Sequence, residues 1–228
     1  MLLLILVQGI ATTNADDWEF EITPYLWTAG IDADIGPPLR PASVDVSFSD
    51  YLELIDIGAA FIFEAKKGKW DITSDVLWLK LSEGLEAKNG VVDFENEQLI
   101  FESQFGYQAF DYEPLRIVGG FRYMDITTDL EFNDKVSVEI SDDFIDPYAG
   151  LRWRSFVSDK WELDTQVDIG GGNDADLVLA GFITGIYHIN EKFNIKMGYR
   201  ILDIDFESDD LVFDGTLEGI QIGLGIRF

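Results

Sequence analysis

The last ten residues, Gly219-Ile-Gln-Ile-Gly-Leu-Gly-Ile-Arg-Phe228, alternate between apolar and other side chains up to the final residue. Because successive side chains of a β-strand point to opposite sides, this alternation predicts a strand with one apolar face. An ordinary edge strand of a soluble sheet would show the same pattern. Whether the apolar face contacts lipid or a soluble core therefore has to be judged from the rest of the chain. The apolar face consists of Ile220, Ile222, Leu224, Ile226 and Phe228.

The same alternation recurs along the chain in segments long enough to cross a membrane, which for β-strands means about 9 to 11 residues. Short and long polar connections alternate between these segments. The pattern predicts an all-β protein, an antiparallel up-and-down barrel of ten strands, with eight or twelve as the alternatives. The predicted segments are Trp18–Leu26, Ile55–Phe63, Trp70–Trp78, Leu99–Tyr107, Leu115–Tyr123, Pro147–Trp153, Trp161–Ile169, Leu177–Tyr187, Phe193–Ile201 and Ile220–Phe228.

The charges of these segments lie on one face. Their apolar positions carry no Asp, Glu, Lys or Arg, although 26% of the chain is charged. A soluble sandwich would expose one face of each sheet to water and place charges there, whereas an apolar outside and a polar inside are typical of a barrel in lipid. Before Ile55 and Leu99, and beyond Tyr123 and Ile201, the outward positions become acidic and the inward ones apolar. The strands are therefore expected to continue above the membrane.

A terminal Phe preceded by apolar residues at every second position resembles the last strand of Gram-negative outer-membrane β-barrels, where the assembly machinery reads this motif. The opening Trp18-Glu-Phe-Glu-Ile-Thr-Pro-Tyr-Leu-Trp27 resembles the start of many porin-like proteobacterial barrels of this size. The resemblance covers residues 16–228 and implies one barrel domain in the cell outer membrane. It implies Phe228 as the assembly signal, and lipid bilayer, lipopolysaccharide and the assembly machinery as partners. It implies no activity.

The first 15 residues have an apolar run followed by small polar residues, which predicts a secretory signal peptide cleaved after Ala15. A buried N-terminal strand or helix is the alternative interpretation. No other stretch approaches the roughly 18 consecutive apolar residues that a spanning helix requires.

The composition excludes several kinds of function. With 16 Lys and Arg against 43 Asp and Glu, the net charge of −27 argues against a nucleic-acid partner. The absence of Cys excludes thiolate metal sites and Cys nucleophiles, and no cofactor or resident metal is predicted. Most of the acidic residues fall in the predicted outer segments. Divalent cations at this outer rim are a further expected partner, although a solvated acidic face is the simpler interpretation for Asp203, Asp205, Asp209 and Asp210.

The inward-facing charges predict a network that lines the lumen, and two interpretations stay open. The charges can pair with one another and plug the barrel. Alternatively they can line a narrow pore, which would favour cations because the inward carboxylates outnumber the cations. The predicted network consists of Glu64, Asp75, Glu102, Arg116, Arg122, Asp146, Arg152, Arg154, Asp164, Lys196 and Arg200.

The only histidine, His188, lies next to a predicted periplasmic turn. Lipid A deacylases and omptin-type proteases resemble this chain in size and barrel form, but they place a histidine with Ser or Asp near the outer rim. A non-enzymatic barrel, either a narrow pore or a structural and surface-interaction protein, is therefore the leading hypothesis, and no catalytic residue is predicted. The alternative is an enzyme that modifies lipid A or cleaves peptides at the outer rim with carboxylates alone.

Overall fold

The computed structural model describes residues 17–36, 42–46, 55–87, 90–132, 136–172, 175–207 and 212–228. The predicted signal peptide, Asp209 and Asp210 lie outside these ranges, and within them no helix is long and apolar enough to span a membrane. The described elements are β1 (Glu19–Gly36), β2 (Ala42–Val46), β3 (Ile55–Lys67), β4 (Trp70–Ala87), β5 (Gly90–Tyr107), β6 (Leu115–Phe132), β7 (Val136–Phe156), β8 (Trp161–Gly170), β9 (Ala175–His188), β10 (Phe193–Glu207) and β11 (Val212–Arg227).

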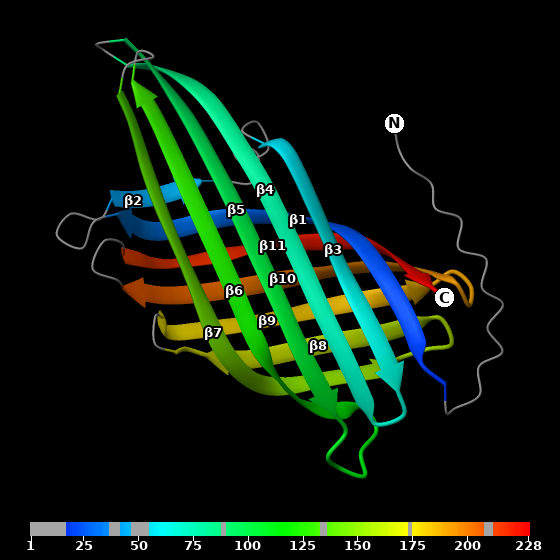
Figure 1. Cartoon of the computed structure of the whole chain (residues 1–228). Helices are drawn as coiled ribbons and strands as arrows, with labels where there is room; N and C mark the ends of the chain where they lie inside the picture. Colours follow the sequence, from blue (N-terminus) through cyan, green and yellow to red (C-terminus); the bar gives the residue numbers. More distant parts are fainter. Residues whose placement is uncertain are drawn as a thin grey trace.

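These strands form one antiparallel sheet that closes on itself where β11 pairs with β1 (Figure 1). On its other side, β1 pairs with β3 at Glu19–Pro24 and with β2 at Ile31–Ile35. Because β2 and β3 share one place in the wall, the barrel has ten strands, as predicted. The structure differs from the predicted single strand leading into Ile55, because the outer part of β1 takes β2 as a separate partner.

A belt of exposed apolar side chains surrounds the barrel. Phe105, Val167 and Met197 expose 62%, 65% and 58% of their surface on its outside. In eight strands the belt spans nine residues, which at about 3.3 Å per residue and about 40° tilt gives a height of about 20–25 Å, close to the lipid-facing band of such barrels. The nine-residue stretches are Trp70–Trp78, Leu99–Tyr107, Leu115–Tyr123, Ile145–Trp153, Trp161–Ile169, Leu179–Tyr187, Phe193–Ile201 and Ile220–Phe228.

The wall continues beyond the belt, most prominently in β4–β7, which rise past the ends of the other strands (Figure 1). On β10, Asp203 and Asp205 are exposed while Ile204 and Phe206 are buried, which confirms the expected exchange of faces. Such alternation favours an extended strand once the apolar face has a core to pack against. The polar stretches predicted as long outer connections are therefore largely strand.

The interior of this outer part is apolar. Phe144 of β7 and Phe206 of β10 stack with ring centroids 4.7 Å apart, and Leu202 of β10 is fully buried. We call this cluster the apolar plug. It consists of Trp27, Ala33, Ile100, Met124, Phe144, Val178, Leu202, Ile204, Phe206 and Leu217.

Candidate functional site: the barrel lumen

Below the apolar plug, the belt encloses two groups of ion pairs. The group nearer the termini, the periplasmic cluster, is centred on Glu64 of β3. Its carboxylate lies 2.9 Å from Arg152 Nη2, Arg154 Nη1 and Lys196 Nζ. Three cations, two on β7 and one on β10, thus converge on one buried carboxylate. Buried charges are stable only when they are paired, and here all four groups have partners. The periplasmic cluster consists of Glu21, Glu64, Arg152, Arg154, Glu162, Asp164, Lys196 and Arg227.

The second group, the outer cluster, lies nearer the apolar plug. Arg200 binds Asp75 at 2.8 Å and also binds Glu102, which accepts a second bond from Arg122 Nε at 2.9 Å. The Arg200 guanidinium lies 4.8 Å from the ring centroid of Trp27, a member of the apolar plug. This contact joins the polar interior to the apolar one, because a guanidinium can stack on an aromatic face while its edge keeps its ion pairs.

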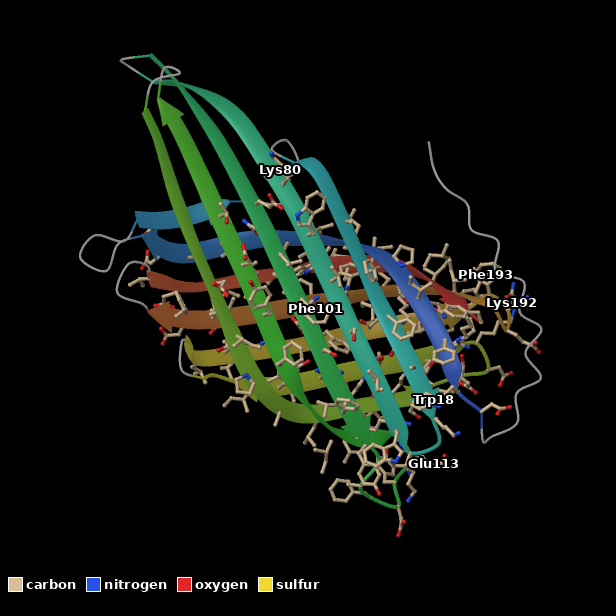
Figure 2. The ribbon with its side chains drawn as sticks, viewed as in Figure 1. Trp18, Lys80, Phe101, Glu113, Lys192 and Phe193 are labelled. Carbon is tan, nitrogen blue, oxygen red and sulfur yellow. The ribbon has the colours of Figure 1, made fainter. Side chains whose placement is uncertain are left out.

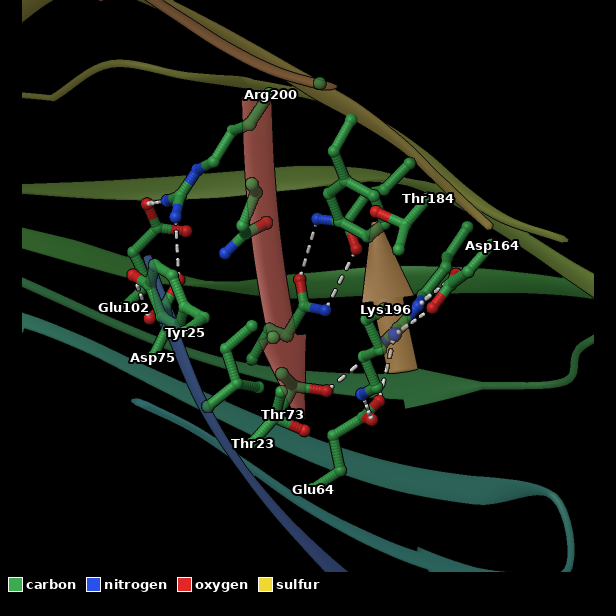
Figure 3. Close-up of a pocket in the computed structure, with 18 of the residues that line it drawn as sticks. Thr23, Tyr25, Glu64, Thr73, Asp75, Glu102, Asp164, Thr184, Lys196 and Arg200 are labelled. Carbon is green, nitrogen blue, oxygen red and sulfur yellow. Dashed lines mark hydrogen bonds and ion pairs between the residues drawn. The ribbon is translucent and has the colours of Figure 1, made fainter. Parts of the chain in front are cut away.

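Figure 3 shows the space between the clusters, with Lys196 on one side and Arg200 on the other. Two glutamines meet in this part of the lumen. Gln104 of β5 donates to Gln166 of β8 at 3.0 Å, and Gln166 donates back at 2.9 Å. A cavity of about 80 Å³ lies beside them, lined by residues of both clusters and by Thr23, Thr184 and Gln221. This polar-lined space is large enough to hold water.

All eleven residues predicted for the network lie on the inner side of the wall. Arg116 pairs with Asp71 at 2.7 Å, apart from the two main clusters, and Asp146 is fully buried. Seven inward-facing cations each make an ion pair with a carboxylate, and Lys66 at the rim lies 4.0 Å from Glu64. The seven are Arg116, Arg122, Arg152, Arg154, Lys196, Arg200 and Arg227. Paired charges of this kind favour the plugged interpretation over an open path.

The predicted lumen network was chosen from charged residues alone, so it left out the uncharged polar residues of the lumen. Tyr25 donates to Asp75 at 2.8 Å, and Tyr148 donates to Gln104 at 3.2 Å. Both tyrosines stand at inward-facing positions of the alternating pattern, and this could have placed them in the lumen. Gln221 Nε2, buried beside the cavity, has no partner among the described residues, and a cavity water is the natural acceptor.

His188 ends β9 at the periplasmic rim, outside the belt. Its Nε2 lies 2.9 Å from Glu162 Oε2, and its ring packs against Phe156. Partial burial and the nearby Arg227 lower the pKa of His188 below its ordinary value of 6.5, against the opposing effect of Glu162. The only histidine therefore lies at the opposite end of the barrel from the outer rim, as predicted.

The outer border of the belt is marked by aromatic side chains that bind the first carboxylates above it. Trp78 Nε1 donates to Glu97 at 2.7 Å, and the Tyr123 hydroxyl donates to Asp125 at 3.1 Å. Amphipathic rings of this kind prefer the membrane interface. Figure 2 places Lys80 toward this end and Glu113 and Lys192 at the other.

A closed barrel with this belt and these borders pairs its strands with one another inside an apolar surface, which is the requirement for spanning a bilayer. Among solved structures, the outer membrane protease OmpT from Escherichia coli matches over 96% of this chain and 99% of its own, with a TM-score of 0.61 and 8% identity. The chain has the fold of the Gram-negative outer-membrane β-barrels. This likeness concerns the fold alone.

Two further solved structures of this outer-membrane barrel class match with lower scores. Ail, the attachment invasion locus protein of Yersinia pestis in complex with sucrose octasulfate, covers 93% of this chain and 99% of its own at 11% identity and a TM-score of 0.45. OprG from Pseudomonas aeruginosa covers 93% and 96% at 14% identity and a TM-score of 0.39. No protein-family model and no curated protein matches the sequence.

Proposed function

We propose that this outer-membrane barrel is non-enzymatic and non-conducting, and that it acts through its outer surface as a structural or surface-interaction protein. The apolar plug carries the proposal. Leu202 and Ile204 expose at most 1% of their surface, and Phe144 stacks on Phe206 above the outer cluster. An ion path needs polar groups or water along its whole length, so buried apolar side chains across the outer part of the lumen support a closed barrel.

The location of His188 supports the non-enzymatic part of the proposal. A base that serves chemistry at the outer rim has to lie within hydrogen-bond reach of its substrate. His188 instead bonds Glu162 at the periplasmic rim. The rival, a carboxylate-only enzyme acting on lipid A or peptides, would have to use acidic residues of the outer surface.

The proposed partners are lipopolysaccharide and divalent cations. Asp203 and Asp205 are exposed directly above Ile201, the last outward apolar residue of β10. The described residues contain no group of three His, Asp or Glu that could hold a metal ion by itself. We therefore propose cations shared between this acidic surface and lipid phosphates. Replacing Asp203, Asp205, Asp209 and Asp210 with Asn should change the sensitivity of cells to a chelator, and unchanged sensitivity would contradict the sharing.

Phe228 is proposed as the signal for the assembly machinery. Its ring exposes 47% of its surface and stacks on Phe20, and its backbone N–H donates to the Phe20 carbonyl at 3.0 Å. Phe228→Ala should lower the amount of folded barrel in the outer membrane more than it lowers stability after refolding. Equal losses in both measurements would assign Phe228 a structural role only.

Single-channel recording in planar bilayers tests the central proposal. The refolded mature chain, residues 16–228, should give no stepwise current. Removing part of the apolar plug, with Leu202→Ala and Phe206→Ala together, should introduce current noise, whereas the lipid-facing Met197→Ala should not. Stepwise cation-selective currents from the unaltered chain would establish the pore instead. Altered lipid A in a deletion strain, restored by the unaltered gene, would establish the enzyme.

A further inference from the structure

The outer half of β7 has an open backbone edge. β7 pairs with β6 up to Phe132↔Val136, but it pairs with β8 only from Tyr148↔Gly170 to Phe156↔Glu162. Just beyond, Gly171 N–H donates to the Pro147 carbonyl at 3.3 Å. Within the part of the chain that the structure describes, no strand pairs with the β8 side of Val136–Phe144, which we call the β7 edge (Figure 1).

The β7 edge is long enough to bind another strand. Its nine residues span about 30 Å at about 3.3 Å per residue, and alternate residues direct their N–H and C=O groups to the open side. Unpaired groups in such a row accept an extended chain readily. The edge begins directly above Ile145, which is 50% exposed and ends the apolar belt on β7. It therefore meets water and polar molecules, not lipid tails.

The charge of the β7 edge selects its partner. The edge contains Glu139, Asp142 and Asp143 and no Lys or Arg. Asp143 is exposed, and Glu139 has the same strand parity. The neighbouring outer stretches of β4–β6, residues 79–87, 90–98 and 124–132, add eight carboxylates and only Lys80 as a cation. The resulting field attracts cationic chains and repels anionic ones.

We propose that the β7 edge binds an extended, Lys- or Arg-rich peptide segment by strand addition. A second copy of this chain is a poor occupant, because pairing two β7 edges would bring six carboxylates and no cation together. The same charges that prevent self-association thus select a basic strand. The proposal rests on the proposed function as a surface-interaction protein, and it gives that function a partner chemistry.

Three nine-residue peptides test the proposal against the refolded mature chain in zwitterionic detergent. The first alternates Lys and Val, the second alternates Glu and Val, and the third keeps the lysines but replaces two valines with Pro. Fluorescence anisotropy should show binding of the first peptide only, weakened by salt. Equal binding of the Pro-containing peptide would overturn strand addition, since Pro cannot donate to a ladder.

Two double variants separate the β7 edge from the general acidity of the surface. Glu139→Gln with Asp143→Asn should weaken binding of the Lys-Val peptide by about tenfold or more, the effect of losing two close charge pairs. Asp203→Asn with Asp205→Asn removes the same charge from β10, a strand paired on both sides. That control should weaken binding by no more than about threefold, as expected for distant, screened charges. Equal losses would overturn a site on β7.

Cross-linking locates the bound strand. Because the chain has no native Cys, a disulfide can form only at the introduced residue. With a mild oxidant present, Ser141→Cys should form a disulfide with a Cys-bearing Lys-Val peptide, whereas Thr216→Cys on β11 should not. Disulfide-linked dimers of the Ser141→Cys chain, formed in preference to the peptide adduct, would identify a second copy as the occupant and overturn the proposal. Channel recordings bear only on the sealed lumen, so the two proposals can fail separately.

Discussion

Phe144 of β7 and Phe206 of β10 stack with ring centroids 4.7 Å apart and planes at 20°, although β8 and β9 lie between their strands in the wall. Their contact joins β7 to β10 above the belt, where no described strand pairs with the β8 side of Phe144. Phe206→Ala should therefore lower the free energy of unfolding by about 3–5 kcal/mol, as for other core aromatics. Urea unfolding in detergent measures this loss. The lipid-facing Met197→Ala should cost clearly less, and equal costs would contradict a packed apolar plug.

Glu64 lies 2.9 Å from three cations and 4.0 Å from Lys66, so its removal should be among the most damaging changes in the lumen. Glu64→Ala leaves Arg152, Arg154 and Lys196 buried with one fewer partner each, and the expected loss is about 3–5 kcal/mol. Glu19→Ala, at an exposed carboxylate of the same barrel end, is the control and should stay within about 0.5 kcal/mol. A mild effect of Glu64→Ala would mean that water replaces the carboxylate.

The reciprocal bonds between Gln104 and Gln166 predict a coupled pair. Gln104→Leu alone should cost about 1–3 kcal/mol, because it leaves a buried amide without its partner. The double change to Leu should cost less than the sum of the two single changes. A double-mutant cycle on urea unfolding measures the coupling. Strict additivity would show that the two amides bond elsewhere.

Two adjacent glycines of β6 should differ in their tolerance of a methyl group. A Cβ on Gly120 would overlap the carbonyl oxygen of Ser103, a backbone atom that cannot move aside. On Gly119, the nearest atom to a Cβ is Tyr148 O at 3.7 Å, an ordinary contact. Gly120→Ala should therefore cost about 1–3 kcal/mol or prevent refolding, while Gly119→Ala should refold normally. Heat-modifiable migration on gels distinguishes the outcomes.

Acid should weaken the barrel through His188. Its pKa is lowered in the folded state, so as pH falls through the ordinary value of 6.5 the unfolded chain takes up the proton first. This contribution to stability is complete above 6.5 and declines below it. His188→Gln should flatten that part of the pH profile of the urea midpoint. An unchanged slope between pH 7 and pH 5 would assign the acid sensitivity to other groups.

The barrel wall could be predicted from the sequence because ten segments alternate with period two, keep all their charges on one face and are joined by alternating short and long connections. Lipid excludes charge from every outward position, which makes the signal strong at strands such as Trp161–Ile169. The exchange of faces beyond Ile201 was equally readable, because Asp203 and Asp205 cannot face lipid and Ile204 needs a core.

The interior was predicted only in part. Strand parity put Glu64 and Arg152 in the lumen, but which cation meets which carboxylate depends on strand tilt, and no local pattern records it. The pairing of Gln104 with Gln166 joins positions 62 residues apart. The separate registers of β2 and β3 against β1 were also unpredictable, because side-chain alternation does not record which part of a neighbouring strand a segment pairs with.

Closure of the barrel has a kinetic consequence. Nearly all ladders join strands that are consecutive in the chain, whereas the β1–β11 ladder brings Glu21 to Arg227 across 206 residues. Long-range contacts form late, because they carry the largest loop-closure entropy. Until they form, both seam strands would show unpaired backbone to hydrocarbon, which is costly. Pairing of the two ends of the chain, where Phe20 meets Phe228, should therefore limit the rate of membrane insertion. If this pairing is slow, a β-meander with all its other ladders formed should accumulate at the membrane surface.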